Sequence, residues 1–131
     1  MTGLNTNILV RFITQDDPLQ SPKGDAIMNS LTPDEPGWIA IASTAEFAWV
    51  MKRIYRVNRE DDYSMLTMFL TWPDIVMENA NLVRSAANLF RQGTAEFTDY
   101  LVESSAREAG CSRTLTFDRK AAKSAGMTLV Q

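Results

Sequence analysis

The chain has 131 residues, which is enough for one domain over residues 1–131 and too few for two. Hydrophobic residues make up 45% of it, so a core can form without disulfides or a structural metal. Sixteen Asp and Glu against thirteen Lys and Arg give a formal net charge of −3. Such a charge attracts nucleic acid only where basic residues cluster locally or a metal is bound.

The absence of histidine excludes the largest number of functions. The chain has no Ser-His-Asp or Cys-His nucleophile pair, no HExxH zinc site and no zinc finger. Its single cysteine, Cys111, excludes internal disulfides, and we expect this small side chain to be buried. The sequence shows no glycine-rich phosphate loop, secretion signal or membrane-spanning run, so we expect a cytoplasmic protein without a membrane partner. If the protein is an enzyme, carboxylates without His favour magnesium or manganese.

Segments typical of strands alternate along the chain with segments of helical apolar spacing. In chain order, we predict a strand at 3–5, helices from about 7 to 14 and 21 to 31, a strand at 38–41, helices at 43–54 and 59–71, a strand at 75–77, helices at 82–92 and 94–110, a strand at 114–117, a short helix after 118 and a strand at 127–130. Ser21, Ser43 and Thr94 are the predicted caps of three of these helices. Strands alternating with helices predict an α/β fold with a parallel sheet covered on both faces.

Four polar residues follow predicted strands or open predicted helices: Asn5, Glu46, Asp99 and Asp118. Ligands of open parallel sheets lie outside the carboxyl ends of the strands, so we expect these side chains to share one pocket at the sheet edge. Each also has a simpler interpretation. Glu46 would complete a capping box with Ser43, Asp118 would cap a helix, Asp99 would face solvent and Asn5 would make a turn.

Several sequence blocks resemble those of PIN-domain nucleases. They are Gly3–Arg11, Trp38–Tyr55, Phe97–Leu101, Ala106–Cys111 and Thr116–Ala121. The blocks occur in the order and at the spacing of that family, over nearly the whole chain. The length and the continuation Arg-Phe-Ile-Thr-Gln-Asp-Asp-Pro at residues 11–18 resemble the VapC toxins of bacterial toxin–antitoxin modules.

This resemblance implies a three-layer α/β/α sandwich with a central parallel sheet and a metal-dependent endoribonuclease activity. It places the catalytic, metal-binding positions at Asn5, Glu46, Asp99 and Asp118, supported by Thr6, Asn7 and Thr116. Carboxylates of such a site hold Mg²⁺ or Mn²⁺, which lower the pKa of a bound water and stabilise the leaving oxygen. The expected substrate is a structured RNA such as transfer RNA. The resemblance also implies a homodimer that is neutralised by a cognate antitoxin.

The chain departs from the family pattern at two positions. Asn5 stands where the family has its first acid, so we expect the activity of this form to be weakened or lost. A catalytically inactive, PIN-like binding protein is therefore the alternative. Glu103 stands where the family more often has a small residue, and it either adds charge near the site or faces solvent. A phosphatase of the haloacid dehalogenase type is a weaker third interpretation, because Asn5 and Asn7 replace the two acids that it needs.

Two surfaces are predicted to contact partners. Basic residues follow Glu46 and Asp118, and they either contact RNA phosphates or are solvated helix ends. They are Lys52, Arg53, Arg56 and Arg59, then Arg119, Lys120 and Lys123. The apolar residues of 47–55 and 65–72 outnumber what one helix pair buries. They belong either to the core or to a groove for an antitoxin helix.

Overall fold

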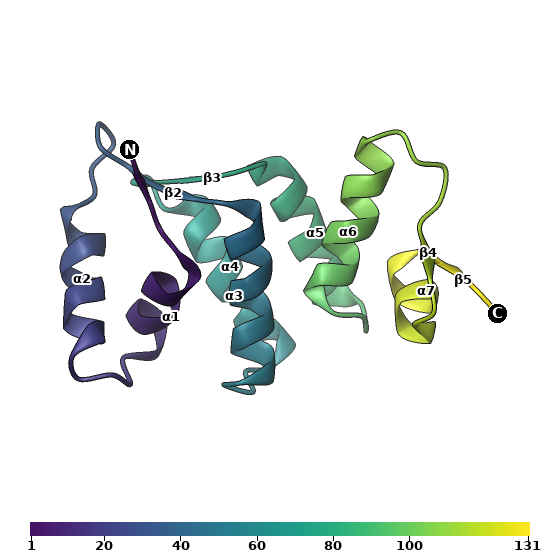
Figure 1. Ribbon diagram of the computed structural model, residues 1–131, viewed down its shortest axis with the longest axis horizontal. Coiled ribbons are helices and arrows are strands. Elements are labelled where there is room, and N and C mark those ends of the chain that lie inside the picture. The colour runs from purple at the N-terminus through teal and green to yellow at the C-terminus, as the bar shows by residue number, and fades with distance from the viewer.

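The computed structural model describes all 131 residues. Its elements in chain order are β1 (Thr2–Gly3), α1 (Thr6–Thr14), α2 (Gln20–Ser30), β2 (Gly37–Ile39), α3 (Ile41–Arg53), α4 (Arg59–Thr71), β3 (Ile75–Met77), α5 (Ala80–Gln92), α6 (Phe97–Glu108), β4 (Leu115–Thr116), α7 (Arg119–Ala125) and β5 (Thr128–Leu129). Figure 1 shows an elongated molecule in which α1 and α2 lie at one end and α7 lies at the other.

The strands are short and all of their pairings are parallel. β1, β2 and β3 form a three-stranded sheet in that order, with Gly37 opposite both Thr2 and Ile75. β4 and β5 form a separate pair, with Leu115 opposite Thr128. Figure 1 shows α5 and α6 between the two sheets. The predicted α/β class with a parallel sheet is confirmed, and its strands are divided between two sheets.

Helices supply most of the core. α3 packs against α1, α4 and α6, and α5 packs against α4 and α6. One cluster of buried apolar residues extends through these contacts, and it includes residues from Leu4 to Ala125. Within it, the rings of Phe47 on α3 and Phe69 on α4 meet edge to face with their centroids 5.3 Å apart. α3 is therefore the element that connects the N-terminal helices to the C-terminal ones.

The predicted cap at Ser21 is wrong. α2 begins at Gln20, one residue before Ser21. Asp17 satisfies the backbone at this end of the helix, because Asp17 Oδ1 accepts from Leu19 N (2.9 Å) and Gln20 N (2.8 Å). Ser21 is buried, and its hydroxyl donates to the Arg11 carbonyl instead (2.9 Å). A carboxylate ahead of a proline can thus take the N–H groups of a turn before a later serine reaches them.

The predicted caps at Ser43 and Thr94 are also wrong. α3 begins at Ile41, whose N–H donates to Glu78 Oε1 at the end of β3 (2.9 Å). Glu46 therefore completes no capping box. α6 begins at Phe97 after its N-cap Glu96, and Thr94 donates its N–H to Ser124 Oγ (2.9 Å). In these cases a residue remote in sequence satisfies the backbone group.

Other local signals are confirmed. α4 has the predicted bounds, and Asn58 caps it by accepting from Asp61 N (2.8 Å). Gly93 follows the last residue of α5 as predicted. Cys111, expected to be buried, is exposed. The reason is that Gly110, with a φ of +97°, ends the last turn of α6 and the chain leaves the core there.

We expect Gly93→Ala to destabilise the protein by about 1–3 kcal/mol, which is typical of overpacking a core. A Cβ at Gly93 would lie 1.7 Å from Tyr100 Oη and 2.8 Å from Ser124 Oγ, two hydroxyls that hydrogen-bond to each other. Thermal unfolding measures the loss. Gly3→Ala is the control, because a Cβ there meets nothing within 4 Å. Equal stability of the Gly93→Ala and Gly3→Ala proteins would contradict this packing.

Candidate functional site

Asn5 and Glu46 line one pocket between α1 and α3, with a volume of about 320 Å³. Asn5 is the N-cap of α1, and its Oδ1 accepts from Thr6 N (2.8 Å). Glu46 is exposed, and its side chain takes part in no hydrogen bond or ion pair. Asn7 lines the same pocket, as does Thr6, whose Oγ1 is buried without a hydrogen-bond partner. The pocket thus gathers polar oxygens, most of them with unused bonding capacity.

Asp99 and Asp118 form a second pair of acids. Asp99 lies in the first turn of α6, where its Oδ2 accepts from Glu96 N (3.1 Å). Burial is the main cause that raises the pKa of Asp99; the Glu96 N–H opposes it, and the nearby charge of Asp118 raises the pKa further. Asp118 caps α7 by accepting from Lys120 N (2.8 Å), and its own N–H donates to Thr116 Oγ1 (3.0 Å). Asp99 and Asp118 are therefore close enough to interact electrostatically.

The donor chemistry of these residues suits a hard divalent cation. Carboxylate and amide oxygens are the ligands that Mg²⁺ and Mn²⁺ prefer. In this structure, however, no three acidic side chains lie close enough together to hold a metal ion. The structure places Asn5 and Glu46 in one pocket, and it places Asp99 near Asp118.

The basic residues near the acids fall into two groups. Lys52 Nζ lies 3.6 Å from Glu96 Oε1, and Arg53 forms an ion pair with the same oxygen. Arg59 donates to the carbonyls of Phe90 and Ala95 (both 2.8 Å), so it fastens α4 to α5 and the following loop. Arg56, Arg119, Lys120 and Lys123 are exposed and form no ion pair. These four are the predicted RNA contacts that remain available.

Glu103 is engaged on its own helix. Its Oε2 accepts from Arg107 Nη2 one turn later (2.6 Å), and only 17% of the Glu103 side chain is exposed. Glu103 therefore does not face solvent, because it is a largely covered partner of Arg107.

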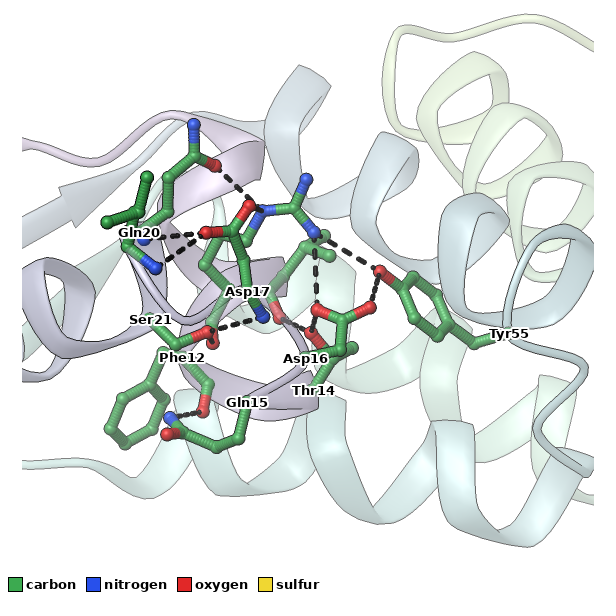
Figure 2. A network of polar contacts seen from close by, with 11 residues as sticks. Phe12, Thr14, Gln15, Asp16, Asp17, Gln20, Ser21 and Tyr55 are labelled. Carbon is green, nitrogen blue, oxygen red and sulfur yellow. Dashed lines mark hydrogen bonds and ion pairs between the residues drawn. The ribbon is translucent and has the colours of Figure 1, made fainter.

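A polar network that the sequence does not indicate adjoins the Asn5–Glu46 pocket. Figure 2 shows Tyr55, from the turn after α3, directed at Asp16, from the turn after α1. The Tyr55 hydroxyl donates to Asp16 Oδ2 (2.8 Å), and Arg11 Nη1 donates to Asp16 Oδ1 (3.3 Å). Hydrogen bonds from Thr14 and Tyr55 lower the pKa of Asp16. Arg11 and Tyr55 both line the pocket.

The family model of the PIN domain matches residues 4–126, which is nearly the whole chain. The chain belongs to the PIN domain family. No curated protein shows a significant match to it. PIN domains are generally nucleases that act on RNA with divalent metals. The predicted resemblance to this family is confirmed, and the phosphatase interpretation gains no support.

None of the seven helices is long and apolar enough to cross a bilayer.

Proposed function

We propose that this PIN-domain protein is a metal-dependent endoribonuclease toxin of the VapC type, which cuts a structured RNA and is weakened by Asn5. The observation that carries the proposal is the shared pocket of Asn5 and Glu46 at the N-terminus of α1. Asn5 stands at the first acid position of the family pattern, and the unpaired Glu46 lines the same pocket. Mg²⁺ or Mn²⁺ is the proposed cofactor, because the four site residues offer oxygen donors alone.

Asn5 explains how the family fold and a weakened activity go together. An amide oxygen can bind a hard cation, but it lacks the charge that offsets the ion's lost hydration. The Asn5 Oδ1 is also engaged by Thr6 N. Aspartate has the same shape and is an equally good N-cap, so it restores the charge and keeps this hydrogen bond.

The test is RNA cleavage by the Asn5→Asp protein with Mg²⁺ or Mn²⁺ on total cellular RNA. We expect cleavage by Asn5→Asp and little or none by the parent chain. The double variant Asn5→Asp/Asp99→Asn is the control, and it is expected to be inactive. Equal activity of the parent and Asn5→Asp would show that position 5 is not a required ligand. If neither protein cleaves RNA although metal is bound, the chain is instead a PIN-like binding protein.

The proposed partners are a cognate antitoxin and a second copy of the chain. Phe47 and Phe69 are each 1% exposed and belong to the core, so they cannot form the predicted antitoxin groove. Trp49 on α3 and Ile54 directly after it are 46% and 62% exposed. Ile54 lines the pocket that contains the unpaired Glu46. An antitoxin segment with an apolar anchor and a basic residue would complement this surface.

A further inference from the structure

α1 separates two hollows and contributes to both. One is the pocket that contains Asn5 and Glu46; the other, of about 340 Å³, lies between α1 and α2 and is lined by Lys23. Asn7 and Arg11, one turn apart on α1, line both hollows. The two side chains therefore form a ridge over which an extended ligand would pass from one hollow to the other.

Arg11 is held on this ridge by residues from three parts of the chain. Its Nε donates to Gln20 Oε1 on α2 (2.8 Å), and its Nη1 donates to Asp16 Oδ1 (3.3 Å) and Tyr55 Oη (3.4 Å). Figure 2 shows these dashed contacts converging between Asp16, Gln20 and Tyr55. Nη2 has no hydrogen-bond partner, and 32% of the side chain is exposed. A guanidinium that is already oriented loses little entropy when its free N–H groups bind an anion.

Two carboxylates lie beside Arg11 and offset part of its charge. Asp16 and Asp17 are 3.3 and 4.0 Å from it, and hydrogen bonds lower the pKa of both. Asp17 is held by the N–H groups of the turn, with Gln20 as the main cause. These acids therefore orient Arg11 and also weaken its attraction for an anion. Lys23 in the neighbouring hollow has no ion pair and adds positive charge next to them.

We propose that Arg11 binds a backbone phosphate of the RNA strand beside the bond that is cut, and that Lys23 contacts the strand farther along. This inference rests on the proposed function, since it assumes that the scissile phosphate lies at Asn5 and Glu46. Six residues of α-helix separate Asn5 from Arg11, which is about 9 Å along the axis. Arg11 is therefore in position for a phosphate one or two nucleotides away.

The experiment measures the affinity of the parent chain for a labelled RNA hairpin over a range of salt concentrations. We expect Arg11→Gln to weaken binding about 5- to 10-fold and to lower the salt slope by about one, as the loss of one phosphate contact does. Lys23→Gln should lower the slope similarly. The matched control Arg84→Gln changes an exposed cation on α5, and we expect no effect from it.

Asp16→Asn separates phosphate binding from a purely structural role. If Arg11 binds phosphate, removing the neighbouring negative charge raises RNA affinity severalfold. If Arg11 only fastens the turn, Asp16→Asn leaves affinity unchanged or lowers it together with the melting temperature. Should Arg11→Gln fail to fold, Arg11→Lys keeps the charge but loses the planar fork, and it should bind RNA more weakly with an unchanged slope.

Unchanged affinity and slope in a folded Arg11→Gln or Arg11→Lys protein would overturn the inference. Two further outcomes distinguish failure of the Arg11 contact from failure of the proposed nuclease activity. If Asn5→Asp cleaves RNA with the same KM whether or not Arg11 is replaced, the nuclease stands and the Arg11 contact is wrong. If Asn5→Asp never cleaves RNA but Arg11→Gln loses RNA binding, the contact stands and the catalytic proposal is wrong.

Discussion

Replacing Glu46 with Gln in the Asn5→Asp protein is expected to lower kcat/KM for RNA by at least about 10- to 100-fold. That range is typical of residues around a metal ligand, and Glu46 is proposed as a ligand itself. Its side chain makes no hydrogen bond or ion pair, and it completes no helix cap. The substitution should therefore leave the melting temperature unchanged, so that any loss is a loss of chemistry or of metal.

The measurement combines RNA cleavage with Mn²⁺ affinity, both of which should fall together. Glu108→Gln is the matched control: Glu108 is an exposed glutamate on α6 without an ion pair, and its replacement should change neither value. Asp118→Asn would be a less selective test, because Asp118 also caps α7. Full activity of the Glu46→Gln protein would exclude Glu46 from the site.

Short-range signals in the sequence predict much of the fold. Gly93 directly follows α5, and α4 has the bounds that its apolar residues predict. The predicted caps at Ser43 and Thr94 were wrong because residues distant in sequence satisfy the backbone groups there. Glu78 reaches α3 from the end of β3, which no pattern around Ser43 indicates. Hydrogen-bond partners distant in sequence depend on the assembled fold, and local propensity does not contain them.

The candidate site was predictable only in part, for a similar reason. Strand ends and helix starts indicate Asn5 and Asp118 as residues at element boundaries, and the structure confirms both as caps. They do not indicate how the two sheets lie relative to each other, so they do not show which of the four residues share a pocket. The role of Arg11 depends on Tyr55, which is 44 residues later in the chain. No spacing rule connects them.

Asp62 is a buried acid that was not predicted, although its spacing from Leu66 and Phe69 places it on the buried face of α4. Asp62, Leu66 and Phe69 fall on one face of α4, and all three are 1% exposed. A buried face of α4 made of Asp62, Leu66 and Phe69 requires a charged residue inside the core. Sequence patterns count such a residue as polar and assign it to the surface.

Asp62 makes the stability of the protein depend on pH. Its Oδ1 is buried and has no hydrogen-bond partner. Lys52 and Arg59 are the nearest opposing charges, but Lys52 pairs with Glu96 and Arg59 donates to two backbone carbonyls. Burial therefore dominates, and it raises the pKa of Asp62 from 3.8 to about 7. The folded protein keeps this carboxyl protonated at pH values where the unfolded chain has lost the proton.

The free energy of unfolding is consequently expected to fall as the pH rises from about 4 to about 7. The stabilising contribution is complete below the unfolded pKa and is lost as pH rises through the folded pKa; the difference corresponds to about 4 kcal/mol at most. The raised pKa of Asp99 acts in the same direction. Urea unfolding at pH 5, 6, 7 and 8 should show a decline of a few kcal/mol in the parent chain.

Asp62→Asn removes the ionisation, so most of this decline should disappear. The buried amide leaves its own donors unpaired and costs about 1–3 kcal/mol at every pH. The variant should therefore be less stable than the parent at pH 5 and equal or superior to it at pH 8. Asp61→Asn is the control, because Asp61 is the exposed neighbour on α4 and its replacement should keep the parental slope. Parallel pH profiles for the parent and Asp62→Asn would mean that Asp62 does not titrate in this range.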